Sequence, residues 1–164
     1  MSLQYIIDGC NVINHPLFLQ HSNKKIKNQH LALLDLIKTK KLTGSPKNKV
    51  IIVFDGHPNL KDTQEASYLS ETAINVIFSR RETADAKIKK IAENLANPKN
   101  TITVSDDKEI RLFVRLLRGQ TLGVEEFITR RERARPDKGT EIKTELSFTQ
   151  RERINQELKK LWLK

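Results

Sequence analysis

The chain has 164 residues, a length that suits one domain with a hydrophobic core and is too short for two full domains and a linker. Hydrophobic residues make up 37% and charged residues 30%, a composition that excludes a disordered chain. The net charge of +10 favours a nucleic acid as partner, although a basic surface can also serve solubility alone.

No apolar run reaches the roughly 20 residues that a membrane-spanning helix needs. The amino end also lacks a basic region followed by a long apolar stretch, so we expect a protein that is neither exported nor embedded in a membrane. The single cysteine, Cys10, excludes an internal disulfide and a cysteine-rich zinc site. Both observations predict a cytoplasmic protein.

The first half of the chain alternates β-prone runs with a helical pattern. Residues 4–9 form a short apolar run that ends at an acid and a glycine, which predicts a buried strand. Residues 24–41 place apolar side chains at helical spacing between basic ends. A continuous apolar run over residues 49–54 predicts a second strand that leads into a loop. The polar residues 59–72 predict an irregular connection.

The second half continues the same alternation. The expected elements, in chain order, are a strand over 74–78, a helix over 84–95 with Thr83 as N-cap, a strand over 101–104, a helix that stops at Gly119, a short edge strand over 121–124 and a turn over 125–128. Alternating strands and helices predict an α/β fold, with a mostly parallel sheet between two layers of helices.

The pattern changes beyond residue 128. We expect a core domain over residues 1–128, followed by a basic linker and an amphipathic helix within residues 129–164. The helix would begin at Thr149 with a capping box and would carry Trp162 near its apolar face. Docking of that face on the core is the main interpretation, and a partner-binding helix is the alternative.

Acidic residues stand at the ends of predicted strands. Asp8, Asp55 and the pair Asp106 and Asp107 each follow a strand, and Asp85 begins a helix. In parallel sheets these ends meet at one edge, so we expect the acids to converge there. Carboxylates gathered in one place raise one another's pKa unless a cation lies among them. Mg²⁺ or Mn²⁺ would suit carboxylate oxygens, and two such ions could activate water and stabilise a phosphodiester displacement.

Each acid also has an ordinary structural explanation, because aspartate often caps a helix or a turn. For Asp55 the two explanations are equally open. Asp8 is the stronger functional candidate, since an aspartate that ends a central strand would otherwise be buried with poor partners. Asp106 and Asp107 are adjacent, so one of them can cap the following helix while the other faces the site.

Three motifs, in order, resemble the NYN domains, a PIN-like group of ribonucleases, and especially their YacP-like branch. The motifs are DGCNVI over residues 8–13, FSRRETAD over 78–85 and VSDDKEI over 104–110, and Gly119 with VEEF over 124–127 is similar to the closing segment of the family. The resemblance covers roughly residues 4–128. It implies a PIN-like, Rossmannoid three-layer sandwich with a metal-dependent endoribonuclease site.

The resemblance also implies roles for individual residues. Asp8 and Asp85 would be ligands of Mg²⁺ or Mn²⁺, and Asn11 would hold a metal-bound water or the substrate phosphate. The third catalytic acid and ligand is Asp106 or Asp107, and the sequence that follows the pair favours Asp107 as the ligand.

Several neighbouring residues keep two interpretations. Glu82 either reaches the site or lies exposed at a helix start, where a carboxylate suits the helix dipole. Asp55 could support the site from its substrate side. Cys10 stands where the family often has an aromatic residue, and we expect a small, partly buried side chain. His15 and His57 follow strand ends and could act as acid or base, although turn histidines before proline explain both.

Arginines provide the expected RNA contacts. Arg80 and Arg81, beside the second motif, would hold a phosphate of the RNA. Arg111, Arg115 and Arg118 form either a second track or a solvated helix face. Because aromatic residues make up only 5% of the chain, recognition of the RNA backbone or shape is expected to dominate over base stacking.

These features predict an endoribonuclease in which water attacks the phosphodiester in line and, by family resemblance, leaves a 5′-phosphate and a 3′-hydroxyl. The alternative is a noncatalytic RNA-binding module on the same fold. A haloacid-dehalogenase phosphatase would need a second aspartate where Cys10 stands, and a flap-type DNA nuclease would need a helical clamp for which the chain has no room. RNA is the expected partner, and delivery by the ribosome and the oligomeric state stay open.

Overall fold

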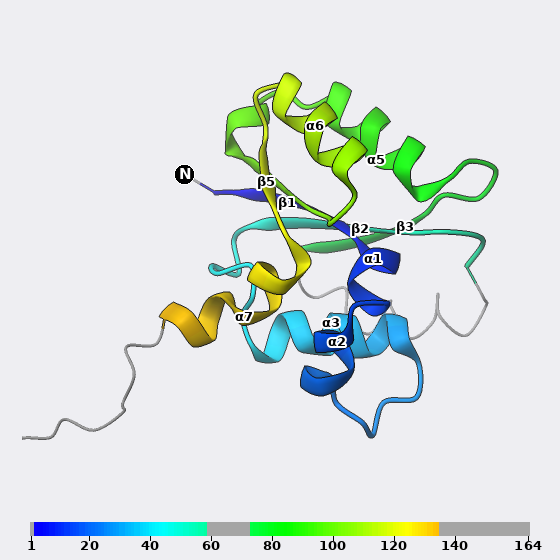
Figure 1. Cartoon of the computed structure of the whole chain (residues 1–164), viewed down its shortest axis with the longest axis vertical. Coiled ribbons are helices and arrows are strands. Elements are labelled where there is room, and N and C mark those ends of the chain that lie inside the picture. Colours follow the sequence, from blue (N-terminus) through cyan, green and yellow to red (C-terminus); the bar gives the residue numbers. More distant parts are fainter. Residues whose placement is uncertain (1, 59–72, 135–164) are drawn as a thin grey trace, which may run out of the picture. The chain divides into compact units, whose positions relative to one another are not determined.

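A central sheet with helices on both sides forms the core of the chain (Figure 1). The computed structural model describes residues 2–58 and 73–134. The strands are β1 (Gln4–Asp8), β2 (Lys49–Phe54), β3 (Ile74–Phe78), β4 (Thr101–Val104) and β5 (Gln120–Leu122). They lie in the order β3-β2-β1-β4-β5, and every neighbouring pair is parallel.

The position of β1 decides where the motifs meet. β1 lies at the centre of the sheet, where Asp8 is in register with Val53 of β2 and Ile7 is in register with Val104 of β4. The segments that follow these three strands therefore leave the sheet at the same edge. This is the edge that carries function in open α/β sheets.

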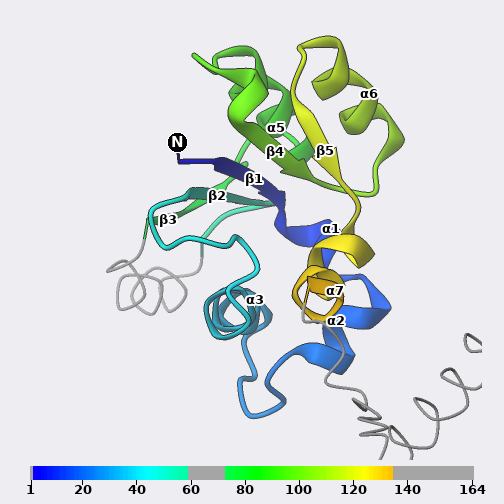
Figure 2. The same ribbon diagram turned by 90° about the vertical axis from the view of Figure 1, so that its left-hand side faces the viewer.

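The helices form two layers (Figure 2). One face of the sheet is covered by α5 (Ala84–Glu93) and α6 (Lys108–Leu116). The other face is covered by α1 (Gly9–Ile13), α2 (Pro16–His21), α3 (Gln29–Thr39) and α7 (Val124–Ala134). A short 3-10 helix, η1 (Pro98–Asn100), precedes β4. The expected α/β three-layer fold is confirmed.

Alternation along β1 shows how one strand serves both layers. Tyr5 and Ile7 join the cluster of buried side chains under α3, and Ile6 joins the cluster under α5 and α6. Successive side chains of a strand point to opposite faces, so a strand buried on both faces must be apolar throughout. This requirement explains the apolar runs within β1 and β2, whereas β4 is buried with threonines at two of its four positions.

The expected strands over 49–54, 74–78 and 101–104 match β2, β3 and β4, and the expected edge strand is β5. Thr83 caps α5 as expected, because its side chain accepts a hydrogen bond from the Ala86 N–H. The first long helix begins at residue 29 rather than 24. The Asn28 side chain accepts hydrogen bonds from the N–H groups of His30 and Leu31, and this cap sets the start of α3.

The two short helices α1 and α2 were not expected. α1 follows directly on β1, with Asp8 as its N-cap, and α2 begins at Pro16 with His15 as its N-cap. Helices this short show too little periodicity to be read from a sequence.

Helix α7 is longer than the expected turn over 125–128. Glu125 and Glu126 lie in its first turn, where carboxylates suit the helix dipole. The guanidinium of Arg130 donates a hydrogen bond to the Tyr5 hydroxyl over 3.2 Å. Residue 128, the expected end of the core domain, therefore lies inside this helix. The expected connection over 59–72 and the helix from Thr149 lie outside the described residues.

Candidate active site

A hollow of about 370 Å³ opens at the carboxyl end of β1, and we call it the acidic hollow. It is lined by Asp8, Cys10, Asn11, Asn14, His15, Pro16, Asp55, Asp85 and Asp106. Its four aspartates come from four segments: the end of β1, the loop after β2, the first turn of α5 and the loop after β4. The fold therefore places Asp8, Asp55, Asp85 and Asp106 around one space, whereas Asp107, the favoured ligand of the pair, is not part of the lining.

Asp8 is the buried acid of this set, with 4% of its surface exposed. Its Oδ1 accepts a hydrogen bond from the Asn11 N–H over 3.1 Å, and its Oδ2 accepts one from the Ser105 hydroxyl over 3.2 Å. Burial raises the pKa of Asp8 to about 6, although the two hydrogen bonds lower it. The charges of Asp85 and Asp55 add to the rise. The ionised form of Asp8 therefore lacks a compensating positive charge.

Ser105 is a residue that the sequence analysis did not single out. Its side chain is fully buried, and its hydroxyl donates to Asp8 and accepts from the Asp107 N–H over 3.1 Å. Ser105 therefore ties the end of β1 to the acidic pair after β4. Its place, a polar residue directly after a buried strand and before two aspartates, is the signal that could have indicated this role.

Asp85 projects from the first turn of α5. Partial burial raises the pKa of Asp85, the charges of Asp107 and Asp55 raise it further, and Lys89 opposes them. Asp55 also fixes this helix, because its Oδ1 accepts a short hydrogen bond of 2.6 Å from the Ala84 N–H. Asp55 thus holds a helix start and also lines the hollow, and its supporting role on the substrate side stays a prediction.

Asp106 and Asp107 divide their roles. Asp107 is the N-cap of α6, where its Oδ1 accepts hydrogen bonds from the N–H groups of Glu109 and Ile110 over 2.7 and 3.1 Å. After burial, the charge of Asp107 is the next largest cause of the raised pKa of Asp85. Which acid of the pair binds a metal stays a prediction.

Asp106 lines the acidic hollow, and its backbone and side chain connect three segments. Its N–H donates to Oδ1 of Asn11 over 3.1 Å, and its own Oδ1 accepts from the Val124 N–H over 2.9 Å. Its Oδ2 lies 3.9 Å from Nε2 of His15. His15 accepts the Leu17 N–H at Nδ1, as a capping turn histidine does, and it also borders the hollow.

Cys10 is half-buried at the rim, and its sulfur accepts a hydrogen bond from the Asp55 N–H over 3.3 Å. Burial raises the pKa of the Cys10 thiol, so the thiol is a poor nucleophile. The expected small, partly buried side chain is confirmed.

The donor chemistry of the acidic hollow suits a hard divalent cation, because carboxylate and amide oxygens dominate its lining. Within residues 2–58 and 73–134, however, no three His, Cys, Asp or Glu side chains lie close enough together to hold a single ion. Mg²⁺ is commonly held by one or two carboxylates and keeps several waters. The acidic hollow therefore fits an Mg²⁺ ion that is held by one or two carboxylates and several waters, rather than an ion held by three side chains.

A second, larger hollow of about 890 Å³ is formed by the segments that follow β2 and β3, and we call it the basic hollow. It is lined by His57, Pro58, Ser79, Arg80, Arg81, Glu82 and Lys90. The loops after β2 and β3 meet here, since the Arg80 N–H donates to the Gly56 carbonyl and the Gly56 N–H donates to the Ser79 hydroxyl.

Arg80 has a left-handed backbone with φ of 60°, which is uncommon for a residue with a side chain. Glu82 pairs with Lys90 over 2.5 Å and with Lys87 over 3.4 Å, so it belongs to this hollow rather than to the acidic one. Arg111, Arg115 and Arg118 line neither hollow.

No helix in the described part of the chain is both long and apolar enough to cross a bilayer. No protein of curated function matches the chain.

Two crystal structures of Rae1 (YacP) from Bacillus subtilis have a similar fold. One, of a single-residue variant, is 22% identical with a TM-score of 0.56, and the match covers 82% of this chain and 79% of that one. The other is 22% identical with a TM-score of 0.55, over 98% of this chain and 82% of that one. A sequence profile of the YacP-like NYN domain matches residues 5–164. The chain therefore belongs to the YacP-like NYN family, whose fold is generally that of ribonucleases.

Proposed function

We propose that this protein is a Mg²⁺- or Mn²⁺-dependent endoribonuclease that hydrolyses RNA phosphodiester bonds at the acidic hollow. The observation that carries the proposal is the placement of Asp8, Asp55, Asp85 and Asp106 around one space at the carboxyl end of the central strand. Such carboxylates repel one another, which is costly unless a cation balances them. The family of the chain and its net charge of +10 support RNA as the substrate.

Each residue has a defined task in this proposal. Asp8 and Asp85 would hold the ion directly, and Asp106 or Asp107 would hold it through a bound water. When bound, the ion would lower the pKa of water and stabilise the charge that develops on the phosphate. Asn11 accepts through Oδ1 from the Asp106 N–H, so its Nδ2 is the part of the side chain that can donate to a phosphate oxygen.

The basic hollow would position the RNA. Arg80 and Arg81 would bind a phosphate next to the one that reacts, which orients the strand across the acidic hollow. Water would then attack in line, break the bond to the 3′-oxygen and leave a 5′-phosphate and a 3′-hydroxyl.

The test is cleavage by the purified full chain of single-stranded and structured RNA in Mg²⁺, Mn²⁺ or EDTA. We expect cleavage only with a divalent ion and a loss of at least about 100-fold in Asp8→Asn and Asp85→Asn, because each removes a charged ligand. Asp35→Asn is the matched control, since Asp35 lies on α3 away from both hollows. Equal cleavage by all four proteins would refute the proposal.

A noncatalytic RNA-binding module is the second candidate. The spacing of the acids favours it, since no three metal-binding side chains converge within the described residues. RNA binding by the wild type without cleavage in either metal, unchanged by Asp8→Asn, would establish this alternative.

The proposal also places the protein in the cytoplasm, where RNA substrates can be free or carried by the ribosome. The single cysteine and the basic charge support this location and both forms of substrate. Co-sedimentation of the full chain with purified ribosomes, at low and high salt, separates ribosome-delivered from free RNA.

A further inference from the structure

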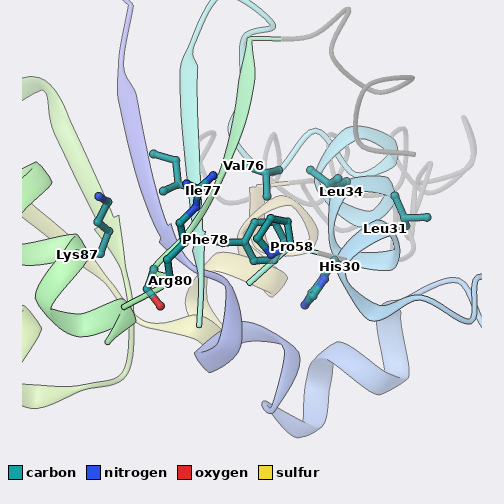
Figure 3. Close-up of a pocket in the computed structure, with 10 residues that line it drawn as sticks. His30, Leu31, Leu34, Pro58, Val76, Ile77, Phe78, Arg80 and Lys87 are labelled. Atoms are coloured by element: carbon teal, nitrogen blue, oxygen red, sulfur yellow. The ribbon is translucent and has the colours of Figure 1, made fainter. Parts of the chain in front are cut away.

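A third pocket, of about 440 Å³, runs along β3, an edge strand of the sheet (Figure 3). Phe78, Pro58 and His30 lie toward α3, and Arg80 and Lys87 lie on the other side of β3. The pocket therefore combines an aromatic and apolar wall with two cationic side chains. We call it the edge pocket.

The aromatic wall is anchored in the core. The centroid of the His30 ring lies 4.2 Å from that of Phe54 and 5.7 Å from that of Phe78. The centroids of the two phenylalanine rings are 5.8 Å apart. Phe54 is fully buried, whereas Phe78 and His30 are half-buried and line the pocket. A cluster fixed from below in this way offers flat ring surface at a small entropic cost, as base-stacking sites do.

The edge pocket is continuous with the basic hollow. Pro58, Ser79 and Arg80 line both of them. Residues 55–58 form a short link from the acidic hollow to the edge pocket, because Asp55 lines the first and Pro58 the second. The carboxylates of the acidic hollow, the cations of the basic hollow and the aromatic rings of the edge pocket therefore follow one another in this order. This order matches the reacting phosphate, a neighbouring phosphate and the base that belongs to it.

We propose that the edge pocket receives one unpaired nucleobase of the RNA, stacked on the ring of Phe78 and in edge contact with His30, whose ring plane is inclined at 70° to that of Phe78, while the phosphate of that nucleotide binds Arg80 and Arg81. The proposal rests on the proposed function for its ligand and deepens it by naming a single-stranded nucleotide beside the cleaved bond. It adds one base contact to a recognition that otherwise depends on the RNA backbone.

The test is a double-mutant cycle between protein and RNA. The full-length Asp8→Asn protein, which leaves the RNA intact under the proposed function, is titrated with a short single-stranded RNA of mixed sequence and with an abasic RNA of the same length. Phe78→Leu is then added. We expect this change to weaken binding of the intact RNA about tenfold and binding of the abasic RNA very little, because only the intact RNA can stack.

Phe113→Leu is the matched control, since Phe113 is also half-buried but lies on α6 outside the edge pocket. His30→Leu is a second variant that keeps an apolar side chain against Phe54, and it should repeat the selective loss. Thermal melting confirms that each variant folds.

Equal effects of Phe78→Leu and His30→Leu on intact and abasic RNA would overturn the proposal, as would failure of the wild type to bind RNA. Binding does not depend on hydrolysis in this experiment. A selective loss by the pocket variants, in a protein that never cleaves RNA, would therefore refute the nuclease and keep the nucleobase site.

Discussion

At the scale of single residues, Asp8 links stability to chemistry. Its pKa rises from an ordinary 3.8 to about 6 in the folded protein, chiefly because the side chain is buried. The folded state therefore binds this proton more tightly than the unfolded state, and the free energy of unfolding falls as pH rises from about 4 to 6. Above that window the ionised Asp8 destabilises the fold by up to about 3 kcal/mol.

Asp8→Asn should consequently raise the stability of the metal-free protein at pH 8 and leave it almost unchanged at pH 4. Urea unfolding of the full chain in EDTA at both pH values measures the difference, with Asp35→Asn as the control. A stabilisation of the same size at both pH values would contradict a buried carboxylate with a raised pKa.

Glycine substitutions at Arg80 and Arg118 separate the effect of the lost side-chain charge on RNA binding from the effect of relieved backbone strain on stability. Both have a left-handed backbone, with φ of 60° and 64°, which costs a residue with a side chain about 1 kcal/mol and costs glycine almost nothing. Arg80→Gly and Arg118→Gly should therefore both keep or raise the melting temperature. Only Arg80→Gly should weaken RNA binding and reduce its salt dependence by about one phosphate contact, because Arg118 lines neither hollow.

Titrating both variants with RNA at several salt concentrations measures this difference. An equal loss of affinity in the two variants would mean that Arg80 contributes only general positive charge.

At the scale of elements, the sequence predicts the strands and helix starts that depend on residues close together in the chain. β2 reads as a continuous apolar run from Val50 to Phe54, and β4 as a short run of the β-branched residues Thr, Ile and Val, and both patterns are visible without a structure. Thr83 at the start of α5 is likewise a local capping signal. The position of each acid after a strand follows from the same pattern, which is why the lining of the acidic hollow could largely be anticipated.

The remaining parts depend on contacts between distant segments. The Ser105 hydroxyl meets Asp8 across 97 positions of the chain, and Asp55 holds the start of α5 across 29. No periodicity within either segment indicates these partners. Helix α1 belongs to the same class, because it is short and its cap is a carboxylate fixed by the sheet.

Gly9 tests how closely α1 depends on the core beneath it. A Cβ at this position would overlap the ring of the buried Phe54. Gly9→Ala should therefore displace either the ring or the helix and destabilise the protein by about 1–3 kcal/mol. Urea unfolding checks the change in stability, and an unaltered midpoint would show that α1 can shift without cost.

At the scale of the whole molecule, charge is distributed unevenly. The chain carries a net +10, yet four aspartates line one hollow at the end of its central strand. Under the proposed function, this arrangement would attract the RNA to the surface and repel it from the site of cleavage. A divalent ion in the acidic hollow would remove that conflict, and binding of the ion should therefore be measurable as stability.

Thermal melting of the full chain at pH 8 should show stabilisation by Mg²⁺ or Mn²⁺ that grows as RT ln(1 + [L]/Kd) and reaches about 2.7 kcal/mol at 100 times Kd. The shift should vanish in EDTA and in Asp8→Asn and Asp85→Asn, and persist in Asp35→Asn. Protons compete with the ion for Asp8, whose pKa is about 6, so the shift should shrink below that pH. An equal shift in Asp8→Asn and the wild type would place the ion elsewhere and leave the repulsion within the acidic hollow uncompensated.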